Sequence, residues 1–122
     1  MAKAEDIEGS IELKVEGEII AIPFCEIIFV ESFGNYVKIA TAAKTYLAQL
    51  TTKVIENLLP EEHFIRIHKS YIVNSHLITK IEHSVVAINS ILLPIGKTYK
   101  QYFLKMVNKK FTSEEDRQPL GQ

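Results

Sequence analysis

Apolar residues in this chain come in short runs, and turn-forming residues close each run after a few positions. In Ile11–Val15 apolar and polar residues alternate, which predicts a half-buried strand. Ile27–Glu31 is almost continuously apolar and predicts a buried strand. No run approaches the roughly 18 apolar residues that a membrane span requires. This pattern predicts a mainly β domain built from many short strands.

Turn residues divide the chain into about ten extended segments. The turns are expected at Glu16-Gly17, within Ser32–Asn35 and at Asn89-Ser90, because glycine and asparagine tolerate the positive φ angles of tight turns. The expected strands are residues 11–15, 20–22, 27–31, 36–40, 45–49, 64–67, 71–73, 77–82, 85–88 and 91–93.

Helical spacing replaces the strand pattern in two places. Thr51 has the chemistry of an N-cap, and Leu50 and Ile55 are placed for a hydrophobic staple. Pro60 ends this short helix. A second helix is expected from Thr98 to about Lys109, because its apolar residues fall on one stripe: Tyr99, Tyr102, Phe103, Met106 and Val107.

Composition favours one globular domain. Apolar residues make up 47% of the 122 residues, so disorder of the whole chain is not expected. The single cysteine, Cys25, cannot form an internal disulfide, and the polar N-terminus lacks the apolar segment of a signal peptide. We therefore expect a cytoplasmic chain with an N-terminal segment at 1–9, a domain at 10–110 and a flexible polar tail at 111–122.

Charge is distributed unevenly along the chain, although the formal net charge is only −1. Residues 1–31 carry eight acidic and two basic residues, whereas residues 63–111 carry eight basic residues and one acidic residue. A local excess of this size can hold an anionic partner even when the whole chain is near neutral. On charge alone, a nucleic-acid surface and a solvated basic face explain the pattern equally well.

Patterns of enzymes and metal sites are weak in this sequence. The glycines are scattered singly, unlike those of a phosphate-binding loop. Ser70 lies only two residues from His68, and no third catalytic group is suggested. The four histidines lack the tight ligand pairs of zinc sites: His63, His68, His76 and His83. We therefore expect no enzyme, no cofactor and no metal site.

The most informative stretch is Phe64–Asn74. A predicted strand leads into a cluster of hydrogen-bond donors, and an apolar segment follows that can brace it: the donors are Arg66, His68, Lys69 and Ser70. Lysine and serine can contact phosphates or base edges. Taken by itself, the cluster could equally serve to satisfy backbone groups at the end of a strand.

This stretch resembles the Phe-x-Arg-x-His-[Arg/Lys]-Ser-[Tyr/Phe]-x-Val-Asn core of LytTR domains, the output modules of LytR/AlgR-type response regulators. Three further landmarks of the family match in the same order, at Ile28–Val37, Leu58–Pro60 and Leu93–Tyr99. The match covers roughly residues 10–107. Four landmarks in order are far more specific than any one of them.

The resemblance implies an elongated fold of about ten short strands in small stacked antiparallel sheets, with one or two short helices. It also implies a sequence-specific, double-stranded DNA-binding domain of a bacterial transcriptional regulator in a two-component system. Loops of such domains enter successive major grooves, commonly at paired direct repeats. The family's base-contacting positions fall at Asn35 or the adjacent Tyr36, at Lys69 and at Lys97; we expect Asn35, Lys69 and Lys97 to contact bases.

The chemistry of these side chains agrees with that role. Lysine donates to guanine O6 or N7, and asparagine can pair with adenine. Lys97 follows Gly96 and precedes the expected helix start, where free N–H groups attract an anion. The family often has arginine at this position, and lysine lacks its bidentate fork, so we expect less sharp base selection. Expected phosphate contacts are Tyr36, Lys38, Arg66, Ser70 and Lys100.

Some roles and partners stay open at this point. Arg66 is equally suited to bracing the loop and to touching phosphate, whereas His68 and Asn74 are assigned to structure. A receiver domain or a histidine-kinase pathway would be a partner only in a longer protein. Tight DNA binding is expected to need two copies on adjacent half-sites. The rival hypothesis is a free-standing protein-interaction module of the same fold that regulates or inhibits a partner protein.

Overall fold

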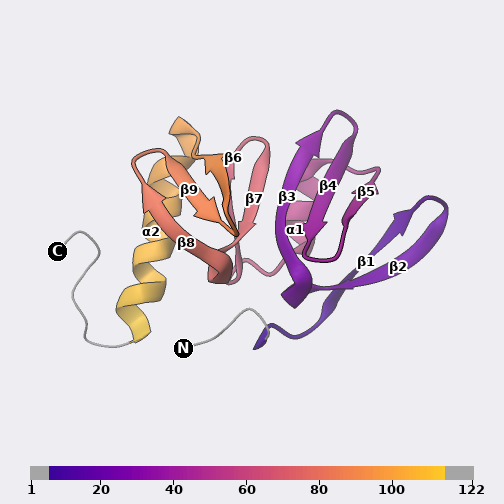
Figure 1. The fold of residues 1–122 in the computed structure, drawn as a ribbon, viewed down its shortest axis with the longest axis horizontal. Helices are drawn as coiled ribbons and strands as arrows, with labels where there is room; N and C mark the ends of the chain where they lie inside the picture. The colour runs from indigo at the N-terminus through magenta and orange to yellow at the C-terminus, as the bar shows by residue number, and fades with distance from the viewer. Residues whose placement is uncertain (1–5, 115–122) are drawn as a thin grey trace.

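The computed structural model describes residues 6–114, with side chains up to residue 109. In this part of the chain, ten strands form three antiparallel sheets, and two α-helices accompany them (Figure 1). The longest axis of the molecule runs from α2 (Lys97–Glu114) to the first hairpin, so the domain is elongated. The mainly β fold expected from the sequence is confirmed.

The sheets follow chain order. The first is a hairpin of β1 (Ser10–Val15) and β2 (Glu18–Pro23). The five-stranded sheet has the order β5-β4-β3-β7-β6, with β3 (Ile27–Phe33), β4 (Tyr36–Thr41), β5 (Thr45–Ala48), β6 (Phe64–His68) and β7 (Tyr71–Asn74). The third has the order β10-β9-β8, with β8 (Ile78–Glu82), β9 (Val85–Ile88) and β10 (Ile91–Pro94). Short 3₁₀ turns lie at Phe24–Glu26 and Ser75–Leu77.

The five-stranded sheet separates two hydrophobic cores, because its side chains alternate between its faces. On one face Val30, Val37 and Ile39 pack with the β1–β2 hairpin and with Ile55 of α1 (Thr52–Leu58). The core on the other face contains residues from β6, β7, β9 and β10 together with two side chains of α2: Ile65, Ile67, Val73, Val86, Ile88, Leu93, Phe103 and Val107. The helices are therefore anchored on opposite faces of one sheet.

The expected turns and the first helix cap are present. Asn89 and Ser90 both have positive φ, at 48° and 70°, as a two-residue hairpin turn of the primed type requires. The Thr51 hydroxyl accepts a hydrogen bond from Val54 N at 3.2 Å, and Leu50 packs against the core that holds Ile55. The turn after β3 is tighter than expected, because the strand continues to Phe33.

The second helix differs from its expected bounds at both ends. α2 begins at Lys97 rather than Thr98, since the Gly96 amide donates to the Ile67 carbonyl at 2.7 Å and fixes the chain just before the helix. It ends at Glu114 and so runs through 111–114 of the segment expected to be a flexible tail. The sequence offers no glycine or proline after Gly96 to stop it before Pro119. The rest of that segment, 115–122, lies outside the described residues.

Asn74 fixes the far end of β7. It is fully buried; its side-chain amide donates to the Ile27 carbonyl at 2.9 Å, and its oxygen accepts from the His76 amide at 3.0 Å. Buried polar groups are hydrogen-bonded in this way because an unpaired one would cost free energy. The structural role expected for Asn74 is confirmed.

No helix in the described part of the chain is long and apolar enough to cross a membrane.

Candidate nucleic-acid interface

Three turns lie along one long edge of the molecule, the upper edge in Figure 1. They are the β3–β4 turn at Gly34-Asn35, the β6–β7 turn at Lys69-Ser70 and the first turn of α2 at Lys97. The three positions expected to contact bases are thus brought to one edge from segments about 30 residues apart in the chain. Asn35, Lys69 and Lys97 are all exposed.

Backbone hydrogen bonds hold the three turns together. The Ser32 amide on β3 donates to the Ser70 carbonyl at 2.8 Å, which joins the first turn to the second. The Gly96 amide donates to the Ile67 carbonyl at 2.7 Å, which joins the second turn to the start of α2. Because each link is formed by backbone atoms of an ordered element, the turns are positioned relative to one another before any ligand binds.

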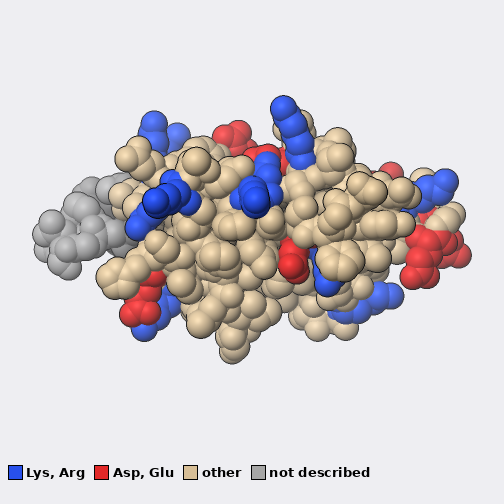
Figure 2. Space-filling view, turned by 90° about the horizontal axis from the view of Figure 1, so that it is seen from above, with Lys and Arg blue, Asp and Glu red and all other residues tan. Residues whose placement is uncertain are grey.

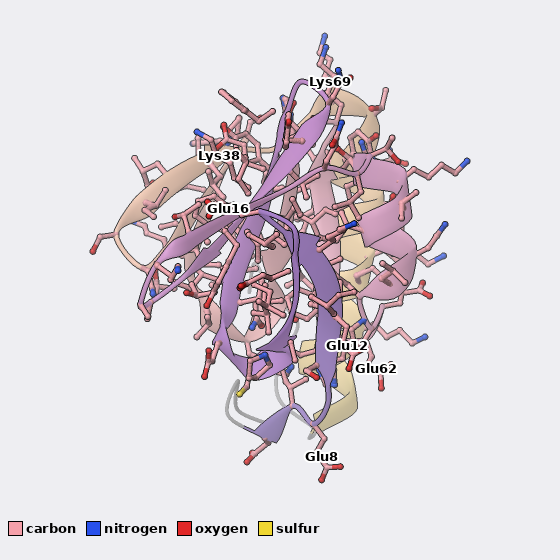
Figure 3. All side chains as sticks on the ribbon, turned by 90° about the vertical axis from the view of Figure 1, so that its right-hand side faces the viewer. Glu8, Glu12, Glu16, Lys38, Glu62 and Lys69 are labelled. Atoms are coloured by element: carbon pink, nitrogen blue, oxygen red, sulfur yellow. The ribbon has the colours of Figure 1, made fainter. Side chains whose placement is uncertain are left out.

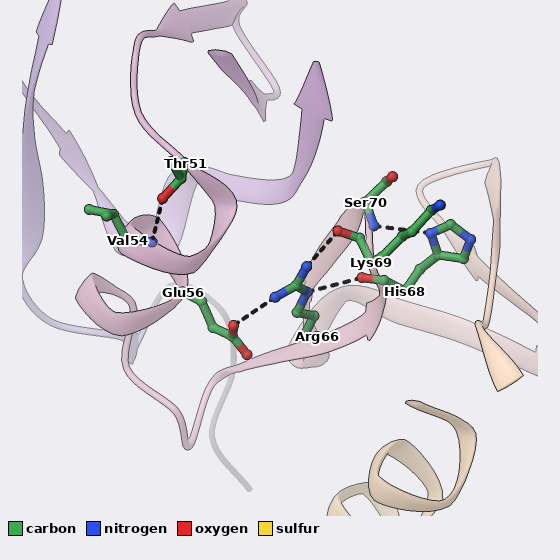
Figure 4. Close-up of polar contacts among 7 residues, drawn as sticks. All are labelled: Thr51, Val54, Glu56, Arg66, His68, Lys69 and Ser70. Atoms are coloured by element: carbon green, nitrogen blue, oxygen red, sulfur yellow. Dashed lines mark hydrogen bonds and ion pairs between the residues drawn. The ribbon is translucent and has the colours of Figure 1, made fainter. Parts of the chain in front are cut away.

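Side chains also shape the β6–β7 turn (Figure 4). The His68 ring nitrogen Nδ1 accepts a hydrogen bond from the Ser70 amide at 3.0 Å, so His68 has the structural role expected for it. Arg66 donates from Nε to the His68 carbonyl at 3.1 Å and from Nη2 to the Lys69 carbonyl at 2.6 Å. These bonds fix the turn backbone and leave the Lys69 side chain directed outward.

Arg66 is itself held from two sides. Its Nη1 donates to Glu56 Oε1 on α1 at 3.0 Å, and its guanidinium carbon lies 5.3 Å from the centre of the Tyr99 ring on α2. Of the two roles left open for Arg66, these contacts favour bracing the loop. Glu56 was not singled out from the sequence, because its partner lies ten residues away on a different element.

The start of α2 depends on the small size of Gly96. A Cβ atom added to Gly96 would lie 3.3 Å from the Tyr99 ring, 3.4 Å from the His68 ring and 3.5 Å from the His68 Cα. Glycine therefore allows the β6–β7 turn and the helix start to pack against each other. The first amides of a helix have no partner within it, so this position can receive an anion beside Lys97.

The β3–β4 hairpin presents an aromatic pair next to Asn35. Phe33 and Tyr36 are paired across the strands, and their exposed fractions are 52% and 38%. The Lys38 ammonium lies 4.3 Å from the centre of the Phe33 ring, a cation–π distance that keeps the lysine beside the hairpin turn. Phe33 was expected only to form a turn; its position at the exposed end of β3 follows from the strand register.

An acidic residue, Glu31, lies on β3 close to the β3–β4 turn. Glu31 is paired in register with Lys38 on β4 and with Tyr71 on β7, and the Tyr71 hydroxyl donates to its carboxylate at 3.5 Å. Burial, and then the charge and hydrogen bond of Glu31, raise the pKa of Tyr71. The Tyr71 hydroxyl therefore stays protonated and available as the donor at neutral pH.

Most labelled acids lie away from the edge that carries the turns. In Figure 3 Lys69 is the uppermost labelled side chain and Lys38 lies below it, whereas Glu12, Glu62 and Glu8 are in the lower half. Figure 2 views this edge from above and shows the largest group of acidic side chains at the right-hand end, where the β1–β2 hairpin lies. The acids of the N-terminal third are thus most numerous at the hairpin end, although Glu16 lies in the upper half of Figure 3, just below Lys38.

The four histidines form no metal site in the described residues: no group of three or more potential ligands is close enough to hold an ion. His63 and His76 are paired, with Nδ1 of the former 2.7 Å from Nε2 of the latter. Ser75 donates from both its amide and its hydroxyl to the His63 carbonyl. These contacts tie the segment before β6 to the 3₁₀ turn after β7.

A small β domain that presents three linked, partly basic turns along one edge has the features of a nucleic-acid-binding module. The model of the LytTr DNA-binding domain family matches residues 17–108. The chain therefore belongs to the LytTR family of DNA-binding domains, as the motifs in its sequence led us to expect.

Relatives and a solved structure agree with this assignment. The chain is 26% identical over 107 residues to the sensory transduction protein LytT of Bacillus subtilis, covering 83% of this chain and 44% of LytT. It is 35% identical over 72 residues to the transcriptional regulatory protein NatR of the same organism, covering 59% and 31%. A LytTr DNA-binding domain structure from Bacillus cereus superposes with a TM-score of 0.71 at 26% identity, covering 82% of this chain and 97% of that one. The chain thus spans less than half the length of these curated relatives.

Proposed function

We propose that this chain binds specific sequences of double-stranded DNA through its three linked turns and so directs a transcriptional regulator to its sites. The observation that carries the proposal is that Asn35, Lys69 and Lys97 lie on one edge, exposed, on turns joined by backbone hydrogen bonds. Turns whose backbone is already ordered lose little backbone freedom on binding. The family match favours this function over the rival hypothesis of a protein-interaction module.

Within this proposal each turn supplies one contact to a base edge. Lys69 and Lys97 donate to guanine O6 or N7, and the Asn35 amide pairs with adenine. Each lysine is a single cation without the planar fork of arginine, so it discriminates less sharply between bases. We infer that these turns, which lie along the long edge of the molecule, enter successive major grooves on one side of a duplex.

The neighbouring polar groups are assigned to the phosphates. Tyr36 and Lys38 follow the β3–β4 turn on β4, Ser70 lies next to Lys69, and Lys100 lies one helical turn after Lys97. Contacts to phosphate fix the register of the protein on the duplex without carrying sequence information. Arg66 was also expected to contact phosphate. Its described hydrogen bonds go to the turn carbonyls and to Glu56, so we propose that it acts on the DNA through the turn that it braces.

The context of the whole protein is also a proposal. The curated relatives are more than twice as long as the region matched by this chain. A longer protein of that length could also contain a receiver domain that a histidine kinase phosphorylates. We infer binding as a pair of copies at direct repeats, because a single copy offers few contacts and two linked contacts raise the effective affinity. This function needs no cofactor and no catalysis, and it places the chain in the bacterial cytoplasm.

The test of this function is selection from a randomised duplex pool, with fluorescence anisotropy of the bound sequences at two salt concentrations. The proposal predicts a recurring motif and an affinity that falls steeply as salt rises, because phosphate-bound counterions are released on binding. Binding without enrichment of any motif would refute sequence-specific recognition. Absence of binding at low salt would support the protein-partner hypothesis instead.

Replacing Lys100 with alanine tests the division between bases and phosphates. We expect the selected duplex and a random duplex to be weakened by the same factor, and the slope of log affinity against log salt to fall by about 0.9. A loss confined to the selected duplex would make Lys100 a base contact. Lys105→Ala is the control, since Lys105 lies further along α2 and away from the turns.

A further inference from the structure

The Arg66 guanidinium is the junction between α1 and the β6–β7 turn (Figure 4). It donates to the carbonyls of both His68 and Lys69, and its remaining described hydrogen bond goes to Glu56. The pairing of β6 with β7 is irregular between Arg66 and His68, so the regular ladder does not by itself fix the end of β6. The carbonyls of His68 and Lys69 are thus held by Arg66, in addition to the bonds that the Ser70 backbone makes with His68 and Ser32.

Glu56 is placed to keep Arg66 in this position. It follows the fully buried Ile55 on a helix capped by Thr51, so its backbone is fixed against the core. The Arg66 side chain is only 16% exposed, whereas the Glu56 side chain is 41% exposed and forms the outer end of the pair. Without Glu56, a phosphate of bound DNA would compete with the turn carbonyls for the Arg66 guanidinium, because guanidinium groups favour phosphate.

We propose that Glu56 is a positioning residue for DNA recognition, which acts through Arg66 on the turn that carries Lys69. It orients the guanidinium toward the carbonyls of His68 and Lys69 and withholds it from the DNA backbone. The inference rests on the proposed DNA-binding function and adds to it an acidic residue that does not face the duplex. A carboxylate that helps to bind a polyanion is the opposite of what charge alone predicts.

Glu56 could act on DNA binding either through its negative charge or by positioning Arg66, and these two mechanisms predict opposite results for Glu56→Ala. If Glu56 acts only as a negative charge, its removal strengthens binding to every duplex, because less repulsion remains. If it positions Arg66, binding to the selected duplex weakens roughly fivefold to tenfold while binding to a random duplex stays equal or strengthens. The ratio of specific to random affinity is therefore the decisive quantity.

Two further variants separate position from charge. Glu56→Gln removes the charge but keeps an oxygen that accepts from Arg66, so we expect it to retain most of the specific affinity. Glu61→Ala is the matched control, since Glu61 is an acid in the turn after α1 that interacts with the Tyr102 hydroxyl on α2, and no described hydrogen bond joins it to Arg66. Removing that charge should leave the ratio of affinities unchanged.

The experiment measures the affinity of the wild-type chain and these three variants for the duplex selected from the random pool and for a random duplex of the same length. Thermal unfolding of each variant shows that the domain is folded at the assay temperature. A fall in the affinity ratio for Glu56→Ala, with recovery in Glu56→Gln, is the expected result. Equal ratios for Glu56→Ala and Glu61→Ala overturn the inference alone, whereas failure of the wild-type chain to enrich any duplex overturns the proposed function as well.

Discussion

Replacing Lys97 with alanine is expected to weaken binding to the selected duplex by about 1–3 kcal/mol, roughly fivefold to 150-fold. Lys97 is exposed in the first turn of α2, and it is assigned a contact to a base edge as well as proximity to the helix N-terminus. Loss of a base contact costs affinity only on the correct sequence. The loss should therefore be largest on the selected duplex and small on a random one, measured by anisotropy at one salt concentration.

Lys105→Ala serves as the comparison for this variant. It removes the same charge from the same helix, two turns further from the β6–β7 turn. Its effect should be no larger than that of a distant exposed charge, which salt largely screens. If the two alanine variants lost equal affinity for the selected duplex, Lys97 would act only through the general charge of the helix.

Replacing Phe103 with alanine is expected to lower the free energy of unfolding by about 3–5 kcal/mol. Phe103 is fully buried in the core that contains residues of β6, β7, β9 and β10, and it anchors α2 to the rest of the domain. Truncation to alanine loses the buried apolar surface and leaves a cavity that the surrounding strands fill only in part. Urea unfolding followed by circular dichroism measures the change.

Leu104 provides the matched control on the same helix. Leu104 is 37% exposed and lies outside the core cluster that holds Phe103, so Leu104→Ala removes less buried surface and should lower the free energy of unfolding less. An effect of Phe103→Ala no greater than that of Leu104→Ala would mean that α2 does not depend on this core. In that case the position of Lys97 would have to be fixed by the Gly96–Ile67 hydrogen bond alone.

Local sequence signals predicted most of the fold because each strand or helix is short and closed by its own turn residues. Asn89-Ser90 adopts the two-residue turn that its residue types favour, and Thr51 caps α1 as its hydroxyl allows. The exceptions are bounds that depend on distant contacts. The start of α2 is set by a hydrogen bond from Gly96 to β6, which no local pattern reveals.

The sequence predicted which residues form the candidate site, but it did not predict the contacts that hold them in place. The motif at Phe64–Asn74 drew attention to Lys69, yet the partners of Arg66 came from α1 and α2. In the sequence Phe33 looks like an ordinary turn residue. In the structure it is paired with Tyr36 across the strands, and the Lys38 ammonium lies over its ring. Contacts between segments far apart in sequence arise only from packing, so one sequence alone does not specify them.

Titration of the ¹⁵N-labelled chain with the selected duplex, followed by amide chemical-shift changes, tests most directly whether the three turns together bind DNA. We predict that the largest changes fall at residues 34–36, 68–70 and 96–98, which lie on one edge (Figure 1). Only small changes are expected in the acidic β1–β2 hairpin. Changes concentrated in that hairpin, or in only one of the three turns, would contradict a single recognition edge.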